Sequence, residues 1–223
     1  LPDAGVCAVL RVPSGGALRL DPNATANTEF TFEAWVRVDG PGDTPFGRLF
    51  GVEETGACAP ANALPIWSVG VDAGGAVVVR ITDTPRSTFM WSGAPVQAPV
   101  GTFFHVALQY DGAGRGRLFV DGQPTQEFLA VPLRDPLPDG CPITLGAAPG
   151  ALTERQPMTL LRVRHTLDAL YPVAFTPDAA LPRVSRTTYR FSFSDGTPLP
   201  LTDGSTQLTG LGAQLDAAPG ACP

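Results

Sequence analysis

The sequence predicts an all-β protein, a two-sheet antiparallel jelly-roll sandwich, and three observations lead to this fold class. Apolar and polar residues alternate over many short segments, which is the pattern of strands with one buried face. The 223 residues include 25 Gly and 24 Pro without a glycine period, which indicates turns between short strands. Helical periodicity is weak throughout, and residues 167–171 are the best candidate for a short helical turn.

The clearest strand pair lies near the middle of the chain. In residues 102–112 the apolar residues Phe104, Val106 and Leu108 share one face of an extended strand, and residues 116–122 repeat the pattern. Each segment ends in Asp-Gly, which is the strongest short-range signal for a tight hairpin turn. We therefore predict a hairpin that buries one apolar face.

The remaining strands are predicted from the same alternation between turn signals. Residues 29–38 alternate most clearly, with Phe30 and Phe32 on one face and Glu33 and Trp35 on the other. The other predicted strands cover residues 6–12, 17–20, 48–52, 66–71, 76–82, 88–91, 126–129, 143–146, 158–164 and 188–194. The residues predicted to share one core are Phe30, Phe32, Val36, Val106, Leu108, Leu118 and Val120.

Composition and charge exclude several classes of protein. The net charge of −6 argues against a nucleic-acid-binding footprint and against a polybasic membrane anchor. No apolar run approaches the roughly 20 residues that a membrane-spanning helix needs. A chain that starts at Leu1 without methionine is expected to be processed or truncated.

The four cysteines predict the redox environment of the protein. Cys7, Cys58, Cys141 and Cys222 form no C-x-x-C motif and have no histidine nearby, so a zinc site is not expected. Their even number, wide spacing and loop-like neighbours favour two disulfides and an oxidising compartment. Four free thiols in a cytosolic protein are the alternative.

Several motifs together resemble a known family. The segments FTFEAWV (residues 30–36), FFHVALQYDG (103–112), GRLFVDG (116–122) and PITLG (142–146) occur in the order found in laminin-G-like, concanavalin A-like jelly-roll domains. The resemblance covers residues 29–193 approximately. The acidic pair that relatives carry before a Val-Arg strand is Leu160-Leu161 here, so the role of those carboxylates is not carried over.

The resemblance implies further properties of the chain. It implies a single domain over residues 1–223, with a C-terminal extension from about residue 174 that packs back on the sandwich, as in secreted bacterial members. Jelly rolls commonly bring their terminal strands together, which implies that Cys7 pairs with Cys222 and leaves Cys58 to pair with Cys141. It also implies a secreted, periplasmic or cell-surface location, and calcium as a candidate cofactor.

Catalytic patterns are missing from the sequence. A glycoside hydrolase needs two carboxylates across one cleft, about 5–5.5 Å apart in retaining enzymes. Glu53 and Glu54 are consecutive and would point to opposite faces of a strand, whereas Glu29 and Glu33 are interpreted as part of a solvated face with Arg37. We therefore predict no catalytic residue and no enzyme.

Nucleophilic catalysis is not indicated either. No G-x-S-x-G motif occurs, and His105 and His165 are the only histidines. A single histidine without an orienting partner is more often structural than catalytic. His105 is therefore predicted to bond to a neighbouring strand.

Four residues are candidates for ligand binding. Trp91 and Phe89 precede a loop, where an aromatic side chain can stack on a sugar or a peptide, and Arg80 is on the polar face of a nearby strand. Trp35 is either a platform for a sugar ring or a structural residue covered by the C-terminal extension. The arginines of the polar faces either grip acidic groups of a polysaccharide or belong to an ordinary wet or covered face.

Calcium ligands would have to come from turn aspartates. Asp72, Asp83, Asp111, Asp121 and Asp139 all lie in predicted turns, but no D-x-D-x-D-G loop is present. Hairpin turns favour Asp-Gly for backbone reasons alone, so each aspartate is first interpreted as a turn residue.

These observations lead to one functional hypothesis with two alternatives. We expect a non-catalytic extracellular binding or adhesion module that recognises a glycan or an extracellular protein. The alternatives are a carbohydrate-active hydrolase with an unrecognised site and a structural spacer domain of a larger surface protein. A cleft with paired carboxylates would favour the enzyme, an exposed aromatic groove the binding module, and a featureless face the spacer.

Overall fold

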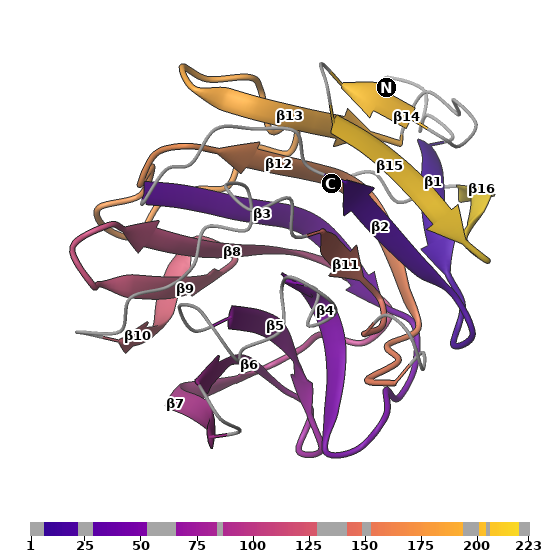
Figure 1. Ribbon diagram of the computed structural model, residues 1–223. Helices are drawn as coiled ribbons and strands as arrows, with labels where there is room; N and C mark the ends of the chain where they lie inside the picture. Colours follow the sequence, from indigo (N-terminus) through magenta and orange to yellow (C-terminus); the bar gives the residue numbers. More distant parts are fainter. Residues whose placement is uncertain are drawn as a thin grey trace, which may run out of the picture.

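The computed structural model describes residues 7–21, 29–52, 66–83, 87–128, 142–148, 153–193, 201–203 and 206–218. Across these ranges the chain forms strands, turns and bends, without a helix, and so without a helix able to cross a membrane. The strands form two sheets, and all neighbouring strands within each sheet run antiparallel. The predicted all-β jelly-roll sandwich is therefore confirmed (Figure 1).

The first sheet is built around the long strand β3, with β12 on one side and β8 on the other (Figure 1). The strand β12 pairs with β1 through its first half and with β13 through its second half. In spatial order the sheet contains β10 (Gln123–Phe128), β9 (Gly116–Val120), β8 (Phe103–Asp111), β3 (Glu29–Val38), β12 (Met158–Thr166), β1 (Cys7–Val12) and β16 (Gln214–Ala218), with β13 (Thr187–Ser192) beside β12.

The second sheet contains the other eight strands. In spatial order these are β14 (Leu201–Asp203), β15 (Thr206–Leu211), β2 (Ala17–Asp21), β11 (Ile143–Leu145), β4 (Phe46–Val52), β5 (Ile66–Asp72), β6 (Ala76–Asp83) and β7 (Ser87–Gln97). The chain changes sheets repeatedly, for example between β3 and β4, so the connections gather at the ends of the sandwich. One of these ends carries the cavities described below.

The inner faces of the two sheets form one continuous core. The first sheet contributes Phe32, Val106 and Leu118, and the second contributes Trp67 and Val79, all almost completely buried. All seven residues predicted to share a core belong to this cluster, because alternation along each strand selects a single face. Burial of apolar surface on this scale is the main source of stability for a sandwich.

Three details differ from the sequence-based expectation. Residues 167–171 form bends and extended chain instead of a helical turn. The strand β7 continues to Gln97, because residues 92–95 bulge out opposite Val78 and pairing resumes at Val96. The strands β14, β15 and β16 were not predicted, because their short polar segments lack a clear alternation.

Residues 167–186 lie across the outer face of the first sheet and are called the covering segment here. Arginines on the sheet donate hydrogen bonds to backbone carbonyls of the covering segment. Arg117 donates to Pro172 O at 2.6 Å, and Arg190 donates to Leu181 O at 2.7 Å. Arg162 and Arg164 donate in the same way to Ala179 and Pro182. The outer face of the first sheet is therefore a covered face, where backbone carbonyl groups accept hydrogen bonds from Arg117, Arg162, Arg164 and Arg190.

Candidate functional site

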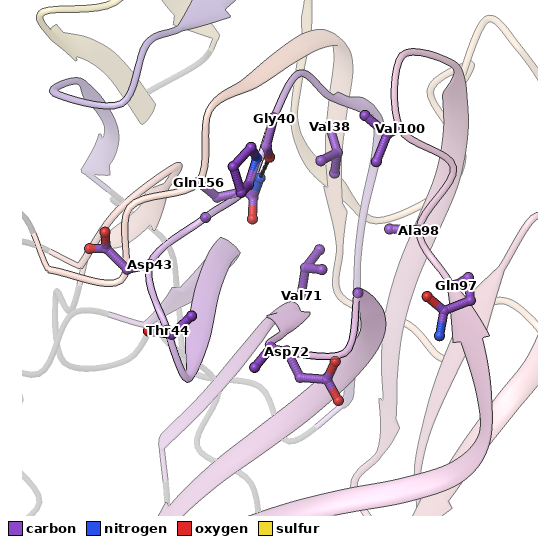
Figure 2. Close-up of a pocket in the computed structure, with 14 residues that line it drawn as sticks. Val38, Gly40, Asp43, Thr44, Val71, Asp72, Gln97, Ala98, Val100 and Gln156 are labelled. Carbon is purple, nitrogen blue, oxygen red and sulfur yellow. Dashed lines mark hydrogen bonds between the residues drawn. The ribbon is translucent and has the colours of Figure 1, made fainter.

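A first cavity of about 350 Å³ opens where three connections between strands meet (Figure 2). The β3–β4 connection forms one wall and the β5–β6 turn forms another. Gln97 at the end of β7, with Ala98 and Val100 after it, forms the third. The side chains of Val38 and Val71 lie in the middle of the view in Figure 2, whereas the carboxylate of Asp43 points away from them. Val100 lies at the opening and is 67% exposed.

Backbone hydrogen bonds hold the three connections together. Ala98 N donates to Gly75 O at 2.9 Å, Gly101 N donates to Val38 O at 2.8 Å, and Ala73 N donates to Pro45 O at 3.1 Å. Each bond joins residues that are far apart in sequence. The walls of the cavity are therefore fixed by the fold, which reduces the ordering cost of binding a ligand.

Three consecutive residues, Glu154, Arg155 and Gln156, organise this end of the molecule. The Glu154 carboxylate bridges Arg48 on β4, at 2.8 Å, and Arg80 on β6. Arg155 pairs through Nε with Asp43 of the β3–β4 connection at 3.1 Å. Gln156 lies in the wall of the first cavity and bonds to the same connection, so the tripeptide ties three elements to one another.

Gln156 fits between two glycines of the β3–β4 region. Its Nε2 donates to Gly40 O at 2.9 Å, and the side chain is buried. A Cβ atom added at Gly42 or at Gly47 would lie 2.3 Å from Gln156 Oε1. Only glycine allows so close an approach, so both glycines are required where the Gln156 amide packs.

A second cavity of about 450 Å³ adjoins the first. It is lined by residues 43–46, Arg80, Thr153 and Glu154, and it shares Asp43 and Thr44 with the first cavity. The guanidinium of Arg80 lies over the ring of Phe46, with 4.4 Å from the guanidinium carbon to the ring centroid. This cation–π contact and the bond to Glu154 fix the position of Arg80 at the cavity wall.

The charges in the two cavities are largely paired. The hydrogen bond from Arg155 holds the pKa of Asp43 below its ordinary value. Asp72 Oδ1 accepts the backbone N–H groups of Gly74 and Ala76, each at 2.9 Å, and so closes the β5–β6 turn. The first cavity thus combines apolar walls with amide and carbonyl groups, and the second presents an arginine beside a carboxylate.

The four residues predicted to bind a ligand have different positions. Arg80 does line a cavity. Trp35 is 9% exposed, and its Nε1 donates to Asp178 O of the covering segment at 3.1 Å. It packs with Leu161 and Leu181, so it is the covered structural residue and not an open platform for a sugar ring.

Phe89 and Trp91 belong to β7, the strand that pairs with β6, and β6 carries Arg80. Their backbones lie opposite Ile81 and Val79, and Met90 between them lies opposite Arg80. The side chains of Phe89 and Trp91 lie outside the described part of the structure, so their role in binding stays a prediction.

Glu33 was interpreted as part of a solvated face, and the structure corrects this. It is completely buried beneath the covering segment, where Oε1 accepts from Arg164 Nε at 2.7 Å. Its Oε2 is 2.9 Å from His105 Nε2 and 2.8 Å from the Tyr171 hydroxyl. Sequence alternation places Glu33 on the outer face correctly, but it does not reveal a second layer above that face.

The pKa values of two members of this buried cluster, Glu33 and Tyr171, are shifted. Burial alone would raise the pKa of Glu33, but the hydrogen bond and charge of His105, with Arg164 and Tyr171, lower it below its ordinary value. Burial, followed by the charge of Glu33, raises the pKa of Tyr171. The cluster is a structural ion network, and His105 bonds to the neighbouring strand β3 as a structural histidine would.

The turn aspartates named as candidate calcium ligands have backbone partners. Asp111 Oδ1 accepts from Ala113 N at 2.9 Å, and Asp121 Oδ1 accepts from His105 N at 2.8 Å, as Asp72 does in its own turn. The side chains of Asp83 and Asp139 lie outside the described residues. In the part of the chain that is described, no three His, Cys, Asp or Glu side chains gather closely enough to hold a metal ion.

The cysteine pairing is not described by the structure. Cys58, Cys141 and Cys222 lie outside the described ranges, and only the backbone of Cys7 is placed. Strands β1 and β16 pair with Cys7 opposite Ala218, so segments from the two ends of the chain lie side by side.

Sequence reasoning missed the tripeptide of residues 154–156. Acidic, basic and amide side chains in a row give no periodic signal. Each of these three residues also forms a bond with a residue more than 70 positions away in the sequence. The usable signal was the spacing of Gly42 and Gly47 around a proline-rich connection, which indicates a close approach by another part of the chain.

Comparison with known proteins places the chain in a family. Residues 13–159, more than half of the chain, match the concanavalin A-like lectin/glucanases superfamily (Laminin_G_3). The chain belongs to this superfamily, which confirms the resemblance drawn from its motifs. No curated protein sequence matches the chain.

Three solved structures illustrate the likeness. A heptameric SAP-like pentraxin from Limulus polyphemus has a TM-score of 0.64 and 15% identity, over 98% of each chain. The receptor binding domain of botulinum neurotoxin D has a TM-score of 0.52 and 9% identity, over 74% of this chain and 41% of the other. Domain 4 of AbnA, a GH43 extracellular arabinanase from Geobacillus stearothermophilus, in complex with arabinotriose, has a TM-score of 0.51 and 16% identity, over 76% and 72%. At these identities the likeness shows the fold alone.

Proposed function

We propose that this protein is a non-catalytic glycan-binding module, whose site is the first cavity and its rim. The observation that carries the proposal is the cavity itself, with fixed walls that combine the apolar Val38, Val71 and Val100 with the amide of Gln97. Sugars present both C–H faces and hydroxyl groups, and preformed sites with apolar walls and a few polar groups suit them. The AbnA domain, solved with arabinotriose, gives an example of a sugar complex on this fold.

A binding role is favoured over hydrolysis by the state of the carboxylates. A glycosidase needs one carboxylic acid with a raised pKa to protonate the leaving group. Asp43 has a lowered pKa because of Arg155, and Glu154 is engaged by two guanidinium groups. Glu33, with a lowered pKa as well, is sealed beneath the covering segment.

A glycan is favoured over a protein partner by the character of the surface. Protein interfaces depend on a buried cluster of aromatic and large apolar anchors. Among the described residues the exposed large apolar side chains are Val100, Val173 and Val184, and no aromatic residue is among them. Single valines of this kind do not form an apolar patch that would dock a folded partner.

The proposed setting is extracellular. The four cysteines with loop-like neighbours support an oxidising compartment, and the superfamily includes lectins. The proposal needs no metal ion, because the two carboxylates of the cavity lining, Asp43 and Asp72, are bonded to Arg155 and to backbone N–H groups.

A glycan array tests the proposal directly. The labelled protein should bind at least one glycan, in calcium as well as in EDTA, and Val100→Arg should abolish that binding by filling the cavity. Val173→Arg is the matched control, because Val173 is also 67% exposed but does not line the cavity. Binding that Val100→Arg leaves intact, or binding only to a protein, would overturn the proposal.

A further inference from the structure

We propose that the two cavities are consecutive subsites of one site, so that the ligand is a linear oligosaccharide of at least two sugar units. This inference rests on the proposed function and extends it to the ligand class. The first cavity would hold one sugar unit against Val100 and Gln97, and the second would hold the next unit against Arg80 and Glu154.

The cavities are joined by their shared wall. Asp43 and Thr44 line both of them, and Thr44 is exposed. The cavities measure about 350 and 450 Å³, each at the low end of the range of about 300–1,000 Å³ for small-molecule sites. Two adjoining cavities of this size suit a chain of rings that passes over Thr44 more than they suit a single ring.

The second cavity has the chemistry to recognise hydroxyl groups. Arg80 donates N–H groups, and Glu154 offers carboxylate oxygens directly beside it. Neighbouring hydroxyl groups on a sugar ring can donate to an acid and accept from a guanidinium at the same time. The apolar edge of the ring would face Pro45, which also lines this cavity.

The two subsites are held in a fixed relation by the residues between them. Glu154 ties the second cavity to β4 and β6, and Arg155 ties the same segment to Asp43 in the shared wall. Glu154 has a φ of 56°, in the left-handed region that residues other than glycine rarely adopt. Backbone strain of this kind persists where surrounding contacts enforce it, and it concentrates at ligand sites.

The test measures affinity against chain length. Calorimetric titrations would use mono-, di- and trisaccharides of the cello-, xylo-, manno- and arabino- series with the full chain. In the series that binds, we expect Kd to fall about tenfold or more from the monosaccharide to the disaccharide, because a second subsite adds a new set of contacts.

Variants assign this gain to the second cavity. Thr153→Trp fills that cavity without removing an ion pair, because Thr153 is exposed and lines only the second cavity. It should remove the tenfold gain and leave monosaccharide affinity unchanged, and Arg80→Met should also remove the gain. Arg115→Met is the control, since Arg115 pairs with Glu127 at an exposed place outside both linings.

The outcomes separate this inference from the proposed function. A monosaccharide that binds as tightly as its trisaccharide, or a length gain that survives Thr153→Trp, would overturn the two-subsite inference and leave the first cavity as the site. If no glycan of the array and none of the four series binds, or if Val100→Arg leaves binding unchanged, the proposed function fails and the inference fails with it.

Discussion

Glu33 on β3 accepts a hydrogen bond from Arg164 Nε on the adjacent strand β12 at 2.7 Å, and both side chains are buried beneath the covering segment. His105 and Tyr171 bond to the other oxygen of the same carboxylate. One carboxylate therefore joins three strands of the sheet face to the segment that covers it. The covering segment therefore buries this outer face, and the ligand site that we propose lies elsewhere, at the loop end of the sandwich.

Replacing Glu33 with Gln should destabilise the protein strongly. The buried guanidinium of Arg164 would lose its ionic partner, and breaking a buried pair typically costs about 3–5 kcal/mol. Urea unfolding would measure the loss. Glu127→Gln is the control, because Glu127 pairs with Arg115 at the surface and should cost less than about 1 kcal/mol. Equal losses for the two variants would contradict the role assigned to the network.

Stability should also fall with acid through His165. Burial lowers the pKa of His165 to about 3 in the folded protein, against 6.5 as its ordinary value. Below pH 6.5 the unfolded chain therefore binds a proton that the folded protein excludes, and stability falls as pH falls toward 3. The slope approaches about 1.4 kcal/mol per pH unit for one group.

His165→Phe tests this prediction by unfolding at pH 7, 6 and 5. The variant keeps an aromatic ring against Tyr189, which stacks on His165 at 5.3 Å, but it loses the bond to Thr188. It should show a flatter dependence on pH between 6.5 and 5 than the parent protein. The parent should lose further stability below about pH 4.5, where the unfolded chain protonates Glu33 while the folded protein, with its lowered pKa, does not. An unchanged slope in His165→Phe would assign the acid sensitivity to other groups.

The close packing of Gln156 gives a prediction about the site itself. Gly47→Ala should cost about 1–3 kcal/mol, because its Cβ would lie 2.3 Å from Gln156 Oε1 and the buried amide would have to shift. Gly40→Ala is the matched control in the same connection, since nothing lies within 4 Å of its added Cβ. Thermal unfolding compares the two variants. The double variant Gly47→Ala, Gln156→Ala should cost less than the sum of the single changes, because the clash is gone.

The sequence predicted the core well because alternation is a local signal. Phe30 and Phe32, like Val106 and Leu108, appear at every second position, and a strand must place them on one face. The hairpin turns at Gly112 and Gly122 were predictable for the same reason, since Asp-Gly marks them directly. The fold class followed from these local rules and from the order of the motifs.

The sequence could not predict what lies against the outer faces. Glu33 looks like a solvated residue in the alternation, and Trp35 could be either an open platform or a covered residue. The contact with residues 167–186 shows that both are buried. Those contacts join arginine side chains to backbone carbonyls, and a carbonyl carries no sequence signature. The contact of Gln156 could not be predicted for the same reason, because its Nε2 donates to the backbone oxygen of Gly40, 116 residues away in the sequence.

The cysteines give the last prediction: a disulfide joins Cys7 to Cys222, and another joins Cys58 to Cys141. The strand pairing places Cys7 opposite Ala218, four residues before Cys222, and a disulfide needs Cα atoms about 4.4–6.8 Å apart. Closing so long a loop should contribute on the order of 5 kcal/mol in the chain-entropy model. Peptide mapping without reduction should recover the two linked pairs. In oxidising buffer the double variant Cys7→Ser, Cys222→Ser should melt at a lower temperature than the parent protein. When the parent protein is reduced, this difference in melting temperature should disappear. A peptide that joins Cys7 to Cys58 or to Cys141 would refute the pairing, and four free thiols would remove the support for an extracellular setting.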